Sequence, residues 1–177
     1  MSAQHQGRAI AGGWALLLAP PLALILKAAI YPGWMMFVII LGAIPLLLGY
    51  ALQIVVAANG MFRERGVFNT APGAQRGIIA AWISSAGILL AAFFLVDGGD
   101  DGTYGSAFTE LVGSSSTASG EALSTALMIP AALAWLAGWA WLVIEWIALL
   151  VRARRQRAAE VASSPSAGSG SGSGSAS

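Results

Sequence analysis

The sequence is 177 residues long, with 57% hydrophobic residues, 10% charged residues, a net charge of +1 and a mean hydropathy of +0.74. Soluble domains carry roughly 25% charged residues, so this composition excludes an ordinary soluble domain. The sequence contains no cysteine, which excludes disulfides and thiolate-ligated metals. Its single histidine, His5, stands in a polar N-terminal tail and predicts no catalytic site.

Four apolar segments are each long enough to cross a bilayer as a helix, which takes about 20 residues. We expect these spans at about 10–30, 34–58, 77–96 and 126–151. The first two are separated by Tyr31-Pro32-Gly33-Trp34, and Pro-Gly suits the centre of a tight turn. The sequence therefore predicts an all-α integral membrane protein, with a four-helix bundle of two hairpins over residues 10–151.

Polar segments flank the expected spans. We expect a tail over 1–9, an inner loop over 59–76, an outer loop over 97–125, and a basic, then Gly/Ser-rich, disordered tail over 152–177. Residues 107–112 are compatible with a short surface helix. Asp97 and Asp101 partly match a calcium loop, but Phe108 replaces its closing glutamate, so a flexible acidic loop is expected instead.

Basic residues are unevenly distributed along the chain. The outer loop contains no Lys or Arg, whereas the other polar segments contain Arg8, Arg63, Arg65, Arg76, Arg152, Arg154, Arg155 and Arg157. Cytoplasmic loops of membrane proteins carry an excess of these residues. This pattern predicts a multi-pass protein of the cell (plasma or inner) membrane with both termini in the cytoplasm. The Ala, Gly and Trp content suggests a bacterium of high GC content.

Two ionisable residues lie inside the expected spans, where such residues are functional candidates by default. Lys27 is near the outer end of the first span, and its long stem can carry the ammonium to the headgroups. Snorkelling of this kind is therefore the expected behaviour of Lys27. Its expected partner is Asp97, Glu121 or a lipid phosphate.

Glu145, in the fourth span, is the second ionisable residue. On a helical wheel it shares a face with Ala134 and Gly138, beside a stripe formed by Trp135, Trp139, Leu142 and Trp146. Small residues suit helix contact, so we expect Glu145 to point into the bundle and the tryptophan stripe to face lipid or a partner.

The expected ion-pair partners of Glu145 are Arg152, Arg8 or an arginine of the inner loop. Lys27 is a poor partner because it stands toward the opposite side of the membrane. Two interpretations of Glu145 remain open: a structural ion pair or neutral acid, and a site for proton transfer or cation binding.

Small residues and prolines mark further positions along the spans. Small residues allow membrane helices to approach closely, and proline removes a backbone hydrogen bond and kinks a helix. The expected packing residues are Gly77, Ala81, Ser85, Ala134 and Gly138. The expected kinks are at Pro20, Pro21, Pro45 and Pro130. Paired broken helices can mark a transporter's binding site, although prolines are also common in membrane helices.

No P-loop, HExxH or Ser-His-Asp pattern is present in the sequence, so neither catalytic residues nor a metal or cofactor are expected. The favoured function is a non-catalytic accessory subunit or scaffold acting through helix contacts. The alternative is a small oligomeric proton- or cation-coupled transporter or channel that uses Glu145, and a membrane enzyme acting on lipid is the third hypothesis. The expected partners are the lipid bilayer and a membrane protein or second copy of the chain, not nucleic acid.

Overall fold

The computed structural model describes residues 3–99 and 102–163. The Gly/Ser-rich segment from residue 164 onward lies outside the described residues, as do Asp100 and Asp101 of the acidic loop. The prediction of a disordered tail therefore remains a prediction for residues 164–177, as does that of a flexible acidic tip, whereas residues 152–163 of the expected tail are helical.

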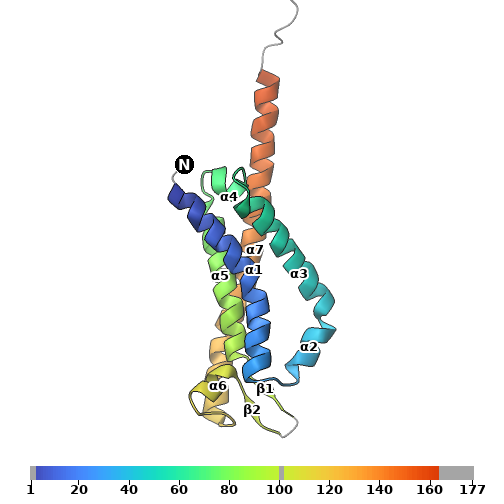
Figure 1. Ribbon diagram of the computed structural model, residues 1–177, viewed down its shortest axis with the longest axis vertical. Helices are drawn as coiled ribbons and strands as arrows, with labels where there is room; N and C mark the ends of the chain where they lie inside the picture. The colour runs from blue at the N-terminus through green and yellow to red at the C-terminus, as the bar shows by residue number, and fades with distance from the viewer. Residues whose placement is uncertain (1–2, 100–101, 164–177) are drawn as a thin grey trace, which may run out of the picture.

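The described residues are mostly helical (Figure 1). Four helices are long and apolar enough to cross a membrane, at Gln6–Ile30, Ala43–Thr70, Gln75–Phe94 and Ala118–Glu160. In chain order the elements are α1 (Ala3–Ile30), α2 (Met35–Leu41), α3 (Ala43–Val56), the π-helix η1 (Ala57–Phe62), α4 (Val67–Thr70), α5 (Gln75–Phe94), β1 (Asp97–Gly98), β2 (Tyr104–Gly105), α6 (Ala107–Leu111) and α7 (Ala118–Ser163).

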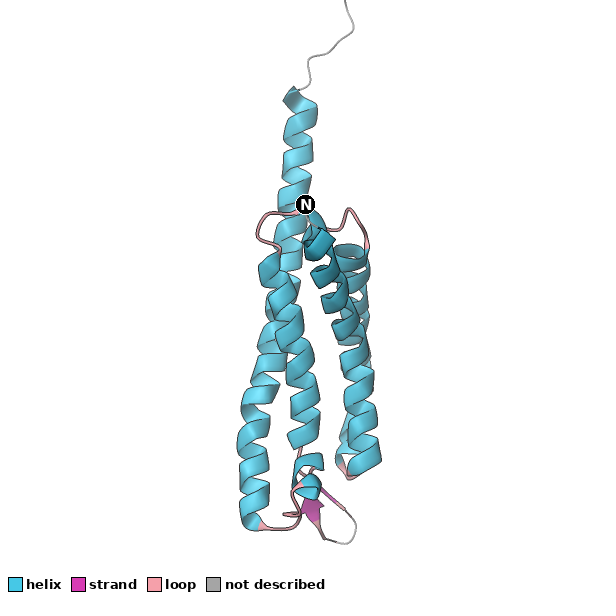
Figure 2. Ribbon diagram, turned by 60° about the vertical axis from the view of Figure 1, so that its left-hand side comes forward, coloured by secondary structure: helices cyan, strands magenta, loops and turns pink. Residues whose placement is uncertain are grey.

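Helices α1, α5 and α7 pack side by side and form the core of the molecule, with α5 in contact with both neighbours. The ends of the described chain, at Ala3 and Ser163, lie at the same end of this core, which we call the termini end. The β1–β2 hairpin and α6, the short helix expected at 107–112, cover the opposite hairpin end (Figure 2). The largest buried cluster lies toward the termini end and includes Leu16, Val56, Met61, Phe68, Leu142 and Leu149.

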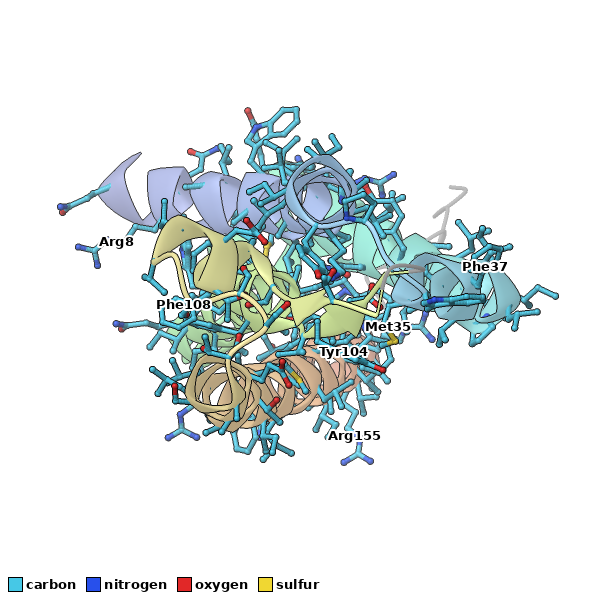
Figure 3. The ribbon with its side chains drawn as sticks, turned by 90° about the horizontal axis from the view of Figure 1, so that it is seen from below. Arg8, Met35, Phe37, Tyr104, Phe108 and Arg155 are labelled. Atoms are coloured by element: carbon cyan, nitrogen blue, oxygen red, sulfur yellow. The ribbon has the colours of Figure 1, made fainter. Side chains whose placement is uncertain are left out.

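The second apolar segment does not pack along the core. Helix α2 contacts mainly α3, and the two helices together form an arm, Met35–Val56, that arches away from α5 and α7. Leu41 is 85% exposed and Ile44 is 73% exposed. Seen from the hairpin end, Phe37 projects at the edge of the molecule (Figure 3). The tight turn thus joins two helices that diverge.

The arm is bent where the sequence predicts it. Pro45 has no N–H to donate to the carbonyl four residues earlier, and its ring crowds that carbonyl. The helix is accordingly interrupted at Gly42, where φ is −86° and ψ is 9°, and α3 resumes at Ala43. The Gly42 N–H still donates to the Val38 carbonyl at 2.8 Å, so the interruption changes the helix direction without unwinding either piece.

The arm returns to the core through the π-helix η1. Its C-terminal carbonyls need partners, because the chain turns to an extended conformation at Arg63. The buried Asn69 amide supplies them: Nδ2 donates to the Met61 carbonyl at 2.8 Å and to the Arg63 carbonyl at 2.7 Å. The short helix α4, which carries Asn69 and Phe68, therefore fixes the end of η1 against the core.

Helix α7 is longer than a bilayer crossing requires. Its 46 residues span about 69 Å at 1.5 Å per residue, compared with about 40–45 Å for a whole bilayer. The helix continues through the basic segment 152–163, which is rich in the strong helix formers Ala, Arg and Gln. It therefore projects beyond the core at the termini end.

Candidate functional site

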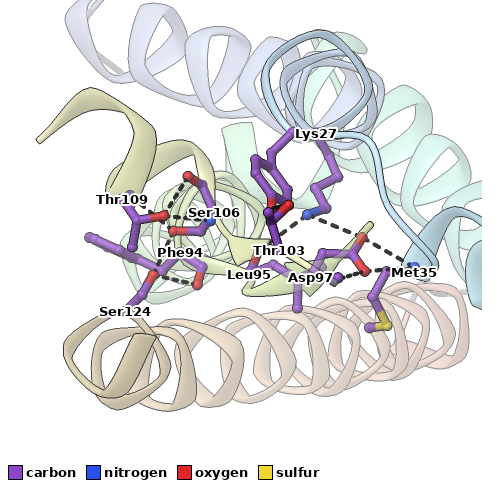
Figure 4. A network of polar contacts seen from close by, with 11 residues as sticks. Lys27, Met35, Phe94, Leu95, Asp97, Thr103, Ser106, Thr109 and Ser124 are labelled. Carbon is purple, nitrogen blue, oxygen red and sulfur yellow. Dashed lines mark hydrogen bonds and ion pairs between the residues drawn. The ribbon is translucent and has the colours of Figure 1, made fainter. Parts of the chain in front are cut away.

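A buried ion pair joins α1 to β1 at the hairpin end. Lys27 Nζ lies 3.3 Å from Asp97 Oδ2, and both side chains are only 2% exposed. The ammonium also donates to the Leu95 carbonyl at 3.2 Å and lies over the Tyr31 ring, 5.5 Å from its centroid. Figure 4 shows the ammonium between these acceptors. The expectation that Lys27 extends to the surface is therefore wrong. Its ammonium stays inside the fold, where the Asp97 carboxylate and the Leu95 carbonyl bind it.

Asp97 has a second role, at the start of α2. The Met35 N–H is 3.1 Å from both carboxylate oxygens, and the Gly98 N–H donates to Oδ1 at 2.9 Å. The N-cap residue of α2, Trp34, makes no side-chain cap hydrogen bond of its own, so the distant Asp97 satisfies a free helix N–H. We call Lys27, Asp97 and the two groups they bond, the Leu95 carbonyl and the Met35 N–H, the Lys27–Asp97 clamp.

The turn sequence explains how the clamp closes. Helix α1 ends at Ile30, two residues before Pro32, because the residue before proline disfavours helical conformation. A Cβ placed on Gly33 would lie 2.5 Å from Asp97 Cγ and 2.7 Å from the Gly98 carbonyl oxygen. Only glycine allows the turn to approach this closely. The Trp34 N–H donates to the Gly98 carbonyl at 3.1 Å and completes the contact.

A second junction lies where α3 crosses α1, at the double proline. Pro20 and Pro21 have no N–H, so the carbonyls of Leu16 and Leu17, four residues earlier, lose their helical donors. Gln53 Nε2 donates to the Leu16 carbonyl at 3.0 Å, and Tyr50 Oη donates to the Leu17 carbonyl at 2.8 Å. The arm thus satisfies both acceptors that the prolines leave free.

A third polar network anchors α6 to α5 and α7 (Figure 4). The fully buried Ser106 hydroxyl accepts from the Thr109 N–H at 3.2 Å as a helix cap and lies 2.7 Å from Ser124 Oγ. Ser124 in turn donates to the Phe94 carbonyl at 2.8 Å, at the last residue of α5. This network ties the start of α7 to the end of α5 and closes the hairpin end.

Glu145 is half-buried and lies about one helical turn from both Leu142 and Leu149, which belong to the buried core cluster. In residues 3–99 and 102–163 it has no hydrogen-bond or ion-pair partner, so the expected pairs with Arg152 and Arg8 do not form. Arg152 is exposed about two turns further along α7. Arg8 points away from the core in Figure 3.

The inner-loop arginine Arg76 lies in the first turn of α5, the helix that packs against α7. A Cβ on Gly138 would lie 2.8 Å from the Ser84 nitrogen, which sets the register of the antiparallel helices α5 and α7. Arg76 precedes Ser84 and Glu145 follows Gly138, each by about two turns toward the termini end. The two residues therefore stand at the same level without forming an ion pair.

The five small residues expected at helix contacts differ in what they touch. Gly138 packs directly on α5. A Cβ on Gly77 would instead collide with the Phe68 ring, so Gly77 accommodates α4 rather than another long helix. Ala81 is fully buried, and Ser85 Oγ bonds back to the Ala81 carbonyl at 2.8 Å.

Gly87 and Ser84 are two further small residues of α5 at its contact with α7. Gly87 was not predicted, yet its Cβ would lie 2.5 Å from the Trp135 nitrogen. Ser84 is buried beside Gly138, and its Oγ has no hydrogen-bond partner within the described part of the chain. On α7, Ala134 is half-buried and no close contact defines its role.

The tryptophan stripe of α7 was expected to face lipid or a partner, but part of it packs against the core of the molecule. Leu142 is fully buried, and Trp146 packs against the core cluster. A Cβ on Gly60 of η1 would lie 3.3 Å from Trp146 Cδ1. The prediction that the stripe faces lipid or a partner fails because tryptophan suits lipid, interface and core equally well. A helical wheel shows which residues share a face of α7 but not which element packs against that face.

The kink residues have different outcomes. Helix α1, which contains Pro20 and Pro21, changes direction about halfway along its length (Figure 1). The arm breaks at Gly42 ahead of Pro45. Pro130 is exposed on α7, and this helix continues through it without interruption.

These features define a helical protein with four candidate membrane spans, whose buried polar groups mainly join its own elements. In the described residues, no group of three or more His, Cys, Asp or Glu could hold a metal ion. No protein-family model, curated protein or solved structure matches the chain.

Proposed function

We propose that the chain is a multi-pass protein of the cell membrane with both termini in the cytoplasm. The support is the separation of charge between the two ends. The arginines belong to segments at the termini end, whereas Asp97, Glu110 and Glu121 belong to segments at the hairpin end. A positive cytoplasmic side is the general rule for short loops of membrane proteins.

Within that membrane, the proposed role is a non-catalytic accessory subunit or scaffold that binds a transmembrane helix through the arm. The observation that carries this proposal is the position of α2 and α3 beside the core, with exposed apolar residues such as Leu41, Ile44 and Leu48. The Lys27–Asp97 clamp fixes one end of the arm, and the Gln53–Leu16 junction fixes the other. Because both ends of the arm are fixed while its middle stands away from α5 and α7, the arm offers a preformed surface to a partner. A preformed surface loses less conformational entropy on binding.

Site-specific photo-crosslinking in membranes tests this role. A photoreactive residue at Ile44 is expected to yield one defined adduct with a membrane protein or with a second copy of the chain. The same probe at Leu133, which is 62% exposed on α7, is the matched control and should yield no such adduct. The captured protein should also co-purify without crosslinking and be lost with Leu48→Ser. Lipid adducts alone at Ile44, or equal capture at both positions, would refute the role of the arm.

The alternative is a small oligomeric proton- or cation-coupled transporter or channel using Glu145. It is favoured by a half-buried carboxylate without a partner in the described residues. It is weakened at the double proline, where Gln53 and Tyr50 already occupy the freed carbonyls that a cation site would use. Glu145→Gln in sealed vesicles separates the two functions: loss of coupled flux by a folded protein supports transport, and a wild-type phenotype eliminates it.

A further inference from the structure

An apolar groove runs between α5 and α7 in the half of the molecule nearest the termini. Its floor consists of the buried residues Ala80 and Gly138, and its walls include Ile83 and Trp141. Gly138 and Ala80 allow α5 and α7 to meet closely here, since a Cβ on Gly138 would lie 3.0 Å from the Ala80 carbonyl oxygen, and the larger side chains of Ile83 and Trp141 line the groove beside this contact. Arg76, the one charged residue of the lining, stands at the end of the groove nearest the termini.

The surroundings of Arg76 favour an anion. Helix α5 has no acidic residue in its first turn, and its N-cap Ala74 makes no side-chain hydrogen bond. The partial positive charge of the helix N-terminus therefore adds to that of the guanidinium. Within the described residues Arg76 has no ion-pair partner, and Glu145, although level with it, does not line the groove.

We propose that this groove binds an anionic phospholipid of the cytoplasmic leaflet. The phosphate accepts hydrogen bonds from the Arg76 guanidinium, whose planar set of N–H donors suits two phosphate oxygens at once. One acyl chain lies over Gly138 between Ile83 and Trp141. Basic pockets between helices on the cytoplasmic side suit anionic headgroups for this reason. The choice of leaflet rests on the proposed topology, whereas the pairing of phosphate with Arg76 does not.

Lipid binding to the purified protein in detergent tests the proposal. Phosphatidylglycerol and phosphatidylcholine are compared by native mass spectrometry and by the shift in unfolding temperature. We expect phosphatidylglycerol to bind the wild type preferentially. Arg76→Gln should lower the affinity for phosphatidylglycerol at least about tenfold, because one or two charge-assisted hydrogen bonds are lost. Ala137→Phe, which places a ring in the groove from an exposed position, should also reduce binding while retaining Arg76.

Arg154→Gln is the matched control, because Arg154 lies roughly 140° around α7 from Trp141 and is not part of the lining. It should bind like the wild type. Equal loss in Arg76→Gln and Arg154→Gln would overturn the proposal, as would equal binding of phosphatidylcholine. Inorganic phosphate that reproduces the shift would show a free-anion site and would also overturn it. These measurements are made in detergent, so a failed topology would leave their outcome unchanged.

Discussion

Gln53 Nε2 donates a 3.0 Å hydrogen bond to the Leu16 carbonyl, the acceptor that Pro20 leaves free in α1. A proline in one helix and a glutamine in another thus form one structural unit, although they are far apart in sequence. The glutamine has a polar side chain inside an apolar segment because the bent helix exposes a polar backbone group at that point.

This relationship predicts a coupling between the two residues. Gln53→Leu leaves the Leu16 carbonyl without its donor and should cost about 1–2 kcal/mol of unfolding free energy. In a Pro20→Ala background, the restored N–H of residue 20 satisfies that carbonyl, so the cost of Gln53→Leu should largely disappear. Denaturant titration of the four proteins in micelles measures the coupling. A Pro130→Ala background is the control, and there the full cost should remain.

The Lys27–Asp97 clamp predicts that the protein is stable only when the Lys27 and Asp97 charges are both present or both removed. Lys27→Met buries an unpaired carboxylate and should cost about 3–5 kcal/mol. Adding Asp97→Asn should recover much of this loss, because the neutral amide oxygen still accepts from the Met35 and Gly98 N–H groups. The unfolding midpoints of the two variants check the prediction. If Lys27→Met unfolds like the wild type, the lysine is exposed and the clamp does not exist.

The α5–α7 contact predicts a large difference between glycines. Gly87→Ala and Gly138→Ala each place a Cβ within 2.8 Å of a backbone nitrogen on the facing helix, so the helices must separate, at a cost of about 1–3 kcal/mol. Gly49 has nothing within 4 Å of its Cβ position. Gly49→Ala should therefore be neutral or stabilise the protein by up to about 1 kcal/mol. A similar loss at all three positions would contradict this register.

The π-helix η1 should depend on one amide. Asn69→Ala removes the donor to the Met61 and Arg63 carbonyls and should cost about 1–3 kcal/mol. Hydrogen exchange followed by mass spectrometry should show faster exchange over residues 57–62. Asn59→Ala is the matched control, because Asn59 also lies in η1 but its amide donates to the Val55 carbonyl of α3 in an exposed hydrogen bond. Unchanged exchange in Asn69→Ala would contradict the capping role.

The helices of this fold could be predicted because each is a long apolar run bounded by Pro, Gly or charge. The path of the arm could not, since residues 35–56 are as apolar as the core helices and hydropathy does not specify a neighbour. Lys27 was expected to snorkel because stem length is visible in the sequence, whereas a partner 70 residues away has to be chosen among several acids. The role of Gln53 could have been found by asking which donor satisfies the carbonyls that Pro20 and Pro21 leave free.

The proposed topology is most directly tested by labelling single cysteines, which the chain permits because it contains none of its own. Val112→Cys and Ser119→Cys are exposed at the hairpin end, and Gln75→Cys and Ala158→Cys are exposed at the termini end. With a membrane-impermeant maleimide, the first two should react in intact cells and the last two only after permeabilisation. Reaction of Gln75→Cys or Ala158→Cys in intact cells, with Val112→Cys and Ser119→Cys protected, would contradict the account.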